Sequence, residues 1–326
     1  MADPGPVLVL GGSGFIGRQV GRAFAATGRE VVTVSRNPAP DPLFARQAAM
    51  DLCAGDSAGL AELLLTVRPS VVVNAVGVIW AASESVMLET NAATATRLVG
   101  AVAALPYRPR LLHIGTIYEY APTEMGARTD TATPEQPTSA YGRTKLVGSR
   151  AVLDASADGR IDGIVLRPSV VVGPGVAANS LLGTVADQLL PMRGTGPAPV
   201  RLAALAGYRD VVDVRDVAAA VVAAATRTVP GRIVNIGGGE AVPVRRLIEM
   251  LIAASGLPAV IEETDPGRPA PGGNSTAPWL QVDLLAAERV LGWRPRVPLA
   301  ESLRSLWEER VSAVAASPDA AISLTQ

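Results

Sequence analysis

The sequence predicts an α/β protein built on a doubly wound parallel sheet, with a smaller C-terminal α/β domain. Three observations favour this fold class. Short β-branched runs alternate with alanine-rich stretches through the first half of the chain, the runs are apolar throughout, and a glycine-rich turn directly follows the first run. Strands that are apolar on both faces are typical of a parallel sheet that helices cover on both sides. The crossovers between such strands are right-handed.

The elements of the first half follow from this alternation. The predicted strands cover residues 7–10, 30–35, 70–74, 110–115 and 161–167, and a further short strand, third in chain order, ends at Asp51-Leu52. The predicted helices cover residues 16–26, 57–66, 85–104 and 141–156. Strands that alternate with helices of this length indicate a series of strand–helix–strand units.

After Pro168 the alternation becomes less regular. We expect helices over residues 180–190, 213–226, 244–255, 284–291 and 299–313, one strand over 232–236, a turn-rich connector over 194–199 and a loop over 266–278. The first domain is assigned residues 1–166 and 208–238, and the second domain residues 167–207 and 239–312. Residues 313–326 are expected to form a frayed tail.

The composition excludes several classes of protein. Of the 326 residues, 48% are apolar and 18% are charged, whereas an intrinsically disordered chain is rich in charge and poor in apolar residues. The net charge of −1 argues against a broad basic surface for nucleic acid. Cys53 and His113 are the only cysteine and histidine, which excludes an internal disulfide and a Cys-cluster or multi-His metal site. No bound metal is therefore expected.

The hydropathy pattern predicts a protein that stays in the cytoplasm. No basic segment precedes the first apolar run at residues 7–10. The longest apolar stretches, such as residues 217–225, are far shorter than the roughly 18 residues that span a membrane. We therefore expect no membrane contact.

The glycine-rich turn predicts a dinucleotide site in the first domain. The run Leu10-Gly-Gly-Ser-Gly-Phe-Ile-Gly17 follows the first strand and opens the first helix. Its glycines allow a tight turn and close approach of the backbone to a pyrophosphate, while the helix N-terminus supplies free N–H groups and a positive partial charge. The residues expected to contact the cofactor here are Gly11, Ser13, Gly14, Phe15, Ile16 and Gly17.

The end of the second strand favours NADP over NAD. An NAD site usually places an acidic residue here for the ribose hydroxyls, but this chain has Ser35 and Arg36, which suit a 2′-phosphate. The alternative is that Arg36 is a solvated turn residue. Further predicted cofactor contacts are Asp51 and Leu52 beside the adenine, and Asn74, Ala75 and Val76 at the end of the strand over residues 70–74.

One lysine marks the candidate catalytic site. Lys145 is the only lysine among 29 basic residues, and a lone lysine in an arginine-rich chain is expected where its compact ammonium is required. Tyr141 lies four residues earlier, on the same helical face. A neighbouring ammonium is expected to lower the pKa of this tyrosine, which can then protonate a developing alkoxide during hydride transfer. Thr116 ends a strand and either hydrogen-bonds the substrate beside Tyr141 or merely caps the strand.

These residues resemble the extended short-chain dehydrogenases/reductases of the nucleotide-sugar epimerase/dehydratase group. The resemblance covers residues 7 to about 310. It rests on the glycine-rich turn, on Thr116 with Tyr120 four residues later, and on Tyr141-x-x-x-Lys145. Three further runs contribute: Leu-Arg-Pro-Ser-Val-Val-Val-Gly-Pro at 166–174, Tyr-Arg-Asp-Val-Val-Asp-Val-Arg-Asp-Val at 208–217 and Leu-Gly-Trp-Arg-Pro at 291–295. Such a fold is a Rossmann domain with a substrate-binding second domain.

The resemblance implies roles for particular residues. Thr116, Tyr141 and Lys145 become the catalytic triad, and Tyr141, Lys145 and Pro168 join the cofactor-binding residues. Arg209 is implied to grip the diphosphate of a nucleotide sugar. The other implied substrate-binding residues are Ile117, Tyr118 and Asn179. The family also implies a homodimer formed through the helices after residues 83 and 141.

Several reactions of this family are disfavoured by the residues present. The 4,6-dehydratases place Asp-Glu directly after the catalytic threonine, where this chain has Ile117 and Tyr118. The GDP-fucose synthase type uses a cysteine and a histidine in the substrate pocket, but Cys53 follows the third strand and His113 lies inside the fifth. The 4-epimerases usually retain NAD, which Ser35-Arg36 does not favour.

The sequence therefore predicts NADPH-dependent reduction of the C4 ketone of an NDP-4-keto-6-deoxyhexose, with dTDP as the expected nucleotide. The chain is similar to the actinobacterial 4-ketoreductases of antibiotic deoxysugar biosynthesis. The apolar lining expected from Val76, Val78, Ile79 and Trp80 suits a deoxygenated sugar. The alternatives are a nucleotide-sugar 4-epimerase with tightly bound NAD, a reductase of a non-sugar carbonyl, and a non-catalytic NADP-binding regulator.

Overall fold

The protein is described here from a computed structural model. The structure describes residues 5–38, 40–54, 57–79, 82–193, 198–227, 231–264 and 278–315. Most of the predicted loop over residues 266–278, the last part of the predicted tail, and Trp80 lie outside the described residues. Within the described residues, no helix has the length and apolar character needed to cross a membrane.

The larger part of the fold is a seven-stranded parallel sheet, which confirms the predicted fold class. Its strand order is β10-β6-β5-β4-β1-β2-β3. The strands are β1 (Val7–Leu10), β2 (Val31–Ser35), β3 (Arg46–Ala49), β4 (Val71–Asn74), β5 (Arg110–Ile114), β6 (Asp162–Pro168) and β10 (Arg232–Ile236). The order reverses between β1 and β4, so a crevice is expected at the carboxyl ends of these two strands.

Helices cover both faces of this sheet because successive residues of each strand point to opposite sides. Val7 and Val9 of β1 pack with α1 (Phe15–Ala26), α7 (Val214–Thr226) and α9 (Leu285–Leu291). Leu8 and Leu10 pack on the other face, with α2 (Ser57–Val67), α4 (Thr94–Ala103) and α5 (Ala140–Ala157). Every residue of β1 is therefore buried, as a strand that is apolar throughout requires.

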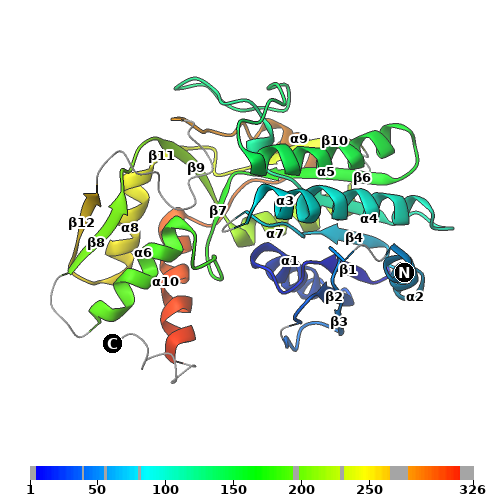
Figure 1. The fold of residues 1–326 in the computed structure, drawn as a ribbon, viewed down its shortest axis with the longest axis horizontal. Helices are drawn as coiled ribbons and strands as arrows, with labels where there is room; N and C mark the ends of the chain where they lie inside the picture. Colours follow the sequence, from blue (N-terminus) through cyan, green and yellow to red (C-terminus); the bar gives the residue numbers. More distant parts are fainter. Residues whose placement is uncertain are drawn as a thin grey trace.

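A smaller part of the fold, with two further sheets and their own helices, lies to the left of the large sheet in Figure 1. It contains a three-stranded sheet in the order β11-β9-β7 and a parallel pair, β12-β8. These strands are β7 (Val170–Val172), β8 (Ala198–Ala203), β9 (Tyr208–Asp213), β11 (Ala241–Pro243) and β12 (Ala259–Thr264). The helices α6 (Leu181–Leu189), α8 (Val244–Ser255) and α10 (Leu299–Ala315) share a core with them. Residues 208–238 contribute to both parts, because β9 pairs with β7 and β11 while β10 pairs with β6.

The predicted single helix over residues 85–104 is interrupted. A short helix α3 (Glu84–Met87) continues as a π-helical segment, Leu88–Ala93, before α4 begins. Asn91 lies in the π-helical segment and is buried. Its side chain exchanges hydrogen bonds of 2.9 and 3.0 Å with the backbone of Val78 and donates one of 3.1 Å to Thr144. The wider turn thus fixes the chain after β4 to α5.

Candidate active site

The glycine-rich turn has the geometry of a pyrophosphate cradle. It joins β1 to α1, and Gly11 has a φ of +80°, which favours glycine. A Cβ at Gly17 would lie 2.2 Å from the carbonyl oxygen of Gly11, so only glycine permits this close packing of helix on turn. No side chain caps α1 at Gly14, and its first turn has no acidic residue. The open helix N-terminus fits the pyrophosphate of a dinucleotide.

The other predicted cofactor residues lie around the same end of the sheet. Ser35 ends β2 and is partly buried, whereas Arg36 is exposed directly after it. The prediction that Asp51-Leu52 ends the third strand is wrong, because β3 ends at Ala49 and these two residues lie in the turn that follows. This short edge strand has no buried residue, so no apolar pattern in the sequence indicates where it ends. Pro168 ends β6 and is buried.

The side chain of Asn74 is engaged within the protein. Its amide nitrogen lies 3.1 Å from Nδ1 of His113, and its Oδ1 accepts a 3.2 Å hydrogen bond from the backbone N–H of Val76. His113 is fully buried, and burial lowers the pKa of its imidazole well below the usual value. The side chain of Asn74 therefore stabilises the turn after β4. The backbone of Ala75 and Val76, directly after this strand, remains as the part of the turn that can contact a cofactor in the crevice.

Thr116, Tyr141 and Lys145 come together at the carboxyl end of β5. Thr116 directly follows this strand, apart from one glycine, and Tyr141 and Lys145 lie in the first two turns of α5. A side-chain hydrogen bond joins Thr116 to Tyr141. Lys145 is buried and its Nζ donates a 2.5 Å hydrogen bond to the carbonyl oxygen of Ile114. The structure thus brings together three residues that the sequence placed in one site.

The predicted low pKa of Tyr141 is wrong in this structure. Burial raises the pKa of its phenol, which the hydrogen bond from Thr116 offsets only in part and the negative charge of Glu119 increases further. Lys145 donates to Ile114 rather than to the phenol, and burial lowers the pKa of its ammonium from 10.5 to about 8 against the opposing effect of Glu119. A tyrosine that keeps its proton at neutral pH is suited to donate that proton.

A buried ion pair beneath the triad was missed by sequence reasoning. Glu119 and Arg167 are both fully buried, and Arg167 Nη2 lies 2.7 Å from Glu119 Oε2. Glu119 also accepts hydrogen bonds from the backbone N–H of Thr116 and the hydroxyl of Ser149. A charged residue inside an apolar strand, as Arg167 is in β6, was the available signal, but its partner could not be read from the sequence.

Two of the predicted substrate residues, Tyr118 and Arg209, contact each other. A side-chain hydrogen bond joins Tyr118, in the 3₁₀ turn Ile117–Glu119, to Arg209 in β9. Burial raises the pKa of Tyr118, and the charge of Arg209 opposes this shift. Asn179 is exposed, one residue before Ser180, which caps α6. Ile117 is buried. Together with Tyr118 it lines a small pocket.

Trp279 is a further residue at this pocket that the sequence did not single out. It lies beside Tyr118, Ser139 and Leu280 in the pocket lining. Its ring centroid is 5.2 Å from that of Tyr208, and its indole N–H donates a 2.7 Å hydrogen bond to the carbonyl oxygen of Ala127. Trp279 and Leu280 thus bring the segment after residue 278 into the wall of this pocket.

The chain belongs to the NAD dependent epimerase/dehydratase family, whose sequence profile matches residues 7–237. It is 41% identical over 313 residues to a dTDP-6-deoxy-L-talose 4-dehydrogenase (NAD(P)(+)) of Kitasatospora kifunensis, with 95% of this chain and 97% of that protein covered. It is 29% identical to a UDP-glucose 4-epimerase of Azospirillum brasilense, over 89% of this chain and 87% of that protein. Among solved structures, MoeE5 in complex with UDP-glucuronic acid and NAD matches with a TM-score of 0.80 and 25% identity, covering 95% of this chain and 100% of that one. The chain is therefore a member of a family of NAD(P)-dependent enzymes.

Proposed function

We propose that this enzyme reduces the C4 ketone of a dTDP-4-keto-6-deoxyhexose with NADPH, in the biosynthesis of antibiotic deoxysugars. The observation that carries the proposal is the Thr116–Tyr141 pair, in which burial keeps a phenol protonated beside a hydroxyl. The similarity to a dTDP-6-deoxy-L-talose 4-dehydrogenase supports it, because oxidation at C4 of such a sugar is the reverse of this reduction. A ketone reductase needs a proton donor at the oxygen that becomes a hydroxyl.

The residues of the site divide the work of such a reduction. When bound, NADPH supplies the hydride to C4. Tyr141 donates its proton to the C4 oxygen, and Thr116 hydrogen-bonds this oxygen and orients the phenol. Lys145 holds a positive charge under the site through its contact with Ile114. Arg209 binds the diphosphate, and Tyr118 fixes the direction of its guanidinium. Binding of the remote diphosphate then places C4 beside the phenol.

The preference for NADPH rests on the residues after β2. Ser35 is partly buried and Arg36 is exposed, and residues 35–38 contain no carboxylate that would bind ribose hydroxyls. An exposed guanidinium at this position is free in space to pair with a 2′-phosphate, for which its bidentate geometry is suited. An NAD-retaining 4-epimerase is the second candidate, favoured by the similarity to the Azospirillum UDP-glucose 4-epimerase.

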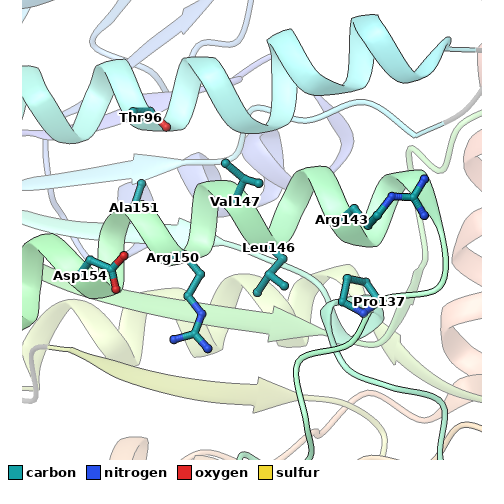
Figure 2. A pocket seen from close by; sticks show the side chains of 8 residues that line it. All are labelled: Thr96, Pro137, Arg143, Leu146, Val147, Arg150, Ala151 and Asp154. Carbon is teal, nitrogen blue, oxygen red and sulfur yellow. The ribbon is translucent and has the colours of Figure 1, made fainter.

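A homodimer is the proposed assembly, formed through the outer face of α5. Figure 2 shows the side chains along this face, with Thr96 on the neighbouring helix α4 and Pro137 just before α5. Val147 in this face is 49% exposed, and Val86 and Leu88 on the adjoining helical segments are similarly exposed. Exposed apolar side chains that gather on one face are typical of a protein–protein interface. Sedimentation of the wild type and of Val147→Glu tests the assembly, and a monomeric wild type would contradict it.

The reaction is tested by following NADPH consumption with dTDP-4-keto-6-deoxyglucose and with its 2,6-dideoxy and 2,3,6-trideoxy relatives. Parallel assays with NADH test the cofactor preference. Steady consumption of NADPH with one sugar supports the reductase. Absence of consumption, together with release of NAD from the denatured protein, would instead identify the 4-epimerase.

A further inference from the structure

Glu119 occupies an unusual position, fully buried directly beneath the triad. Its Oε1 accepts hydrogen bonds of 2.8 Å from the backbone N–H of Thr116 and 2.9 Å from the hydroxyl of Ser149. Its Oε2 accepts a 2.7 Å hydrogen bond from Nε of Arg167. A Cβ at Gly115 would lie only 2.6 Å from Oε1, so the strand end is shaped to admit the carboxylate. All of these partners are donors, and a carboxylate is the form that only accepts.

Arg167 gives this carboxylate a fixed counter-charge. The guanidinium is fully buried, and its carbon lies 4.4 Å from the ring centroid of Tyr120, so the stacked ring orients it. Its Nη2 also bonds Glu135 at 2.7 Å, and Glu135 in turn pairs with Arg150 at the surface. Arg167 therefore lies between two carboxylates, of which only Glu119 contacts the turn that carries Thr116.

The contacts of Glu119 reach both segments that carry the triad, the turn with Thr116 and helix α5. It binds the backbone of Thr116, whose side chain bonds Tyr141. It also bonds Ser149, which lies one helical turn after Lys145 in α5 and on the same face. Glu119 thus faces the buried side of α5, where the ammonium of Lys145 sits.

We propose that Glu119 is a positioning residue for the triad, which fixes Thr116 through its N–H and stabilises the buried ammonium of Lys145. The expected effect of Glu119 on catalysis rests on the proposed reduction. The expected effect of Glu119 on the protonation of Lys145 does not. Without a nearby negative charge, a lysine this buried loses its proton more readily. Glu119 therefore supports the charge of Lys145 at the pH where the enzyme works.

The charged and titratable groups around Glu119 are consistent with this role. They are Arg167 from β6, Lys145 and Tyr141 from α5, and Tyr120 from its own segment, with Glu135 on the far side of Arg167. Burial raises the pKa of Glu119, and Arg167 and then Lys145 act to lower it. For Lys145, burial lowers the pKa and the charge of Glu119 is the opposing influence.

The lone lysine makes a direct test possible. Full-length protein labelled with ¹³C at the lysine side chain gives the signal of one residue, Lys145, whose shift reports its protonation during a pH titration. Glu119→Gln is expected to move the titration midpoint down by about one pH unit. Glu119→Asp keeps the charge and is expected to titrate close to the wild type.

Glu135→Gln is the matched control. It removes the same unit of charge from Arg167 but does not contact Thr116 or α5 at Lys145. Its midpoint is expected to stay at the wild-type value. A shift as large as that of Glu119→Gln, or no shift in Glu119→Gln, would overturn the proposal. If Glu119→Gln fails to fold, the double variant Glu119→Gln/Arg167→Gln, with two neutral amides in the pair, takes its place in the same titration.

The kinetic readout separates this inference from the proposed reaction. As the pH is raised, kcat of Glu119→Gln is expected to begin to fall at a lower pH than kcat of the wild type. The KM for NADPH is expected to change by less than about twofold. An enzyme that reduces the ketone but shows an unshifted Lys145 in Glu119→Gln contradicts this inference alone. A shifted Lys145 in a protein that reduces no ketone contradicts only the proposed function.

Discussion

The phenol of Tyr118 is hydrogen-bonded to the guanidinium of Arg209, which joins the turn after β5 to strand β9 of the smaller sheet. Arg209 also donates a 2.9 Å hydrogen bond to the carbonyl oxygen of Tyr208. The guanidinium is therefore held by one residue from each part of the fold. Tyr118, two positions after Thr116, therefore orients Arg209, the residue that we propose binds the diphosphate.

Tyr118→Phe is expected to weaken substrate binding more than turnover. Loss of the hydroxyl removes one orienting hydrogen bond from Arg209, and a hydrogen bond to a charged group contributes about 1.5 kcal/mol. The KM for the nucleotide sugar should rise about tenfold, with the KM for NADPH unchanged. Steady-state kinetics with each substrate varied in turn measures this. Tyr107→Phe is the control, because its hydroxyl bonds only Leu64 among the contacts described, away from the site.

Tyr141→Phe is expected to reduce turnover by about 10²–10⁴-fold, because the proton donor is lost while the ring remains. Binding of NADPH, followed by its fluorescence, should be preserved. Thr116→Val should have a smaller effect, since it removes the hydrogen bonds of the hydroxyl to the phenol and to the C4 oxygen but leaves the proton donor in place. Normal turnover in Tyr141→Phe would refute the assigned proton donor.

Arg36→Ala is expected to raise the KM for NADPH and to leave the KM for NADH unchanged. The side chain is exposed after β2, so its removal should not disturb the core. Loss of a charge-assisted contact with the 2′-phosphate corresponds to roughly a tenfold rise or more. Equal effects on both cofactors would show that Arg36 does not read the 2′-phosphate.

Lys145 should also give the folded state a particular pH dependence. Burial lowers the pKa of Lys145 from 10.5 to about 8, so the unfolded chain binds more protons at this group between these two values. The buried ammonium therefore destabilises the folded state fully below about pH 8, and this cost falls by roughly 1.4 kcal/mol for each pH unit as the pH rises through that window. Urea unfolding of the wild type and of Lys145→Met at several pH values isolates the effect. The two proteins should differ in slope, and parallel curves would contradict the prediction.

Much of the larger sheet could be predicted from the sequence, because strands such as residues 7–10 and 70–74 are apolar on both faces. The strands of the smaller sheet could not. β8 contains a proline and an arginine, and β9 begins with Tyr208-Arg209-Asp210, so neither shows the pattern of a buried strand. Their pairing depends on partners that are distant in the sequence.

The site shows the same division. The spacing of Tyr141 and Lys145 is local to one helix and could be read directly. The pKa of Tyr141 could not, because it depends on burial among residues from several elements. The pairing of Glu119 with Arg167 likewise joins a turn to a strand 48 positions away, and no local pattern marks it.

The π-helical segment Leu88–Ala93 has a consequence for how this region can change. A regular helix of the same path would need one residue fewer, and each residue removed rotates the remainder of the helix by about 100°. A single deletion within the segment would turn Asn91 away from Val78 and Thr144 or rotate the faces of α4 against α2 and α5. Insertions and deletions in this segment therefore change which face of α4 packs against its neighbours. Substitutions at the exposed positions of the segment do not.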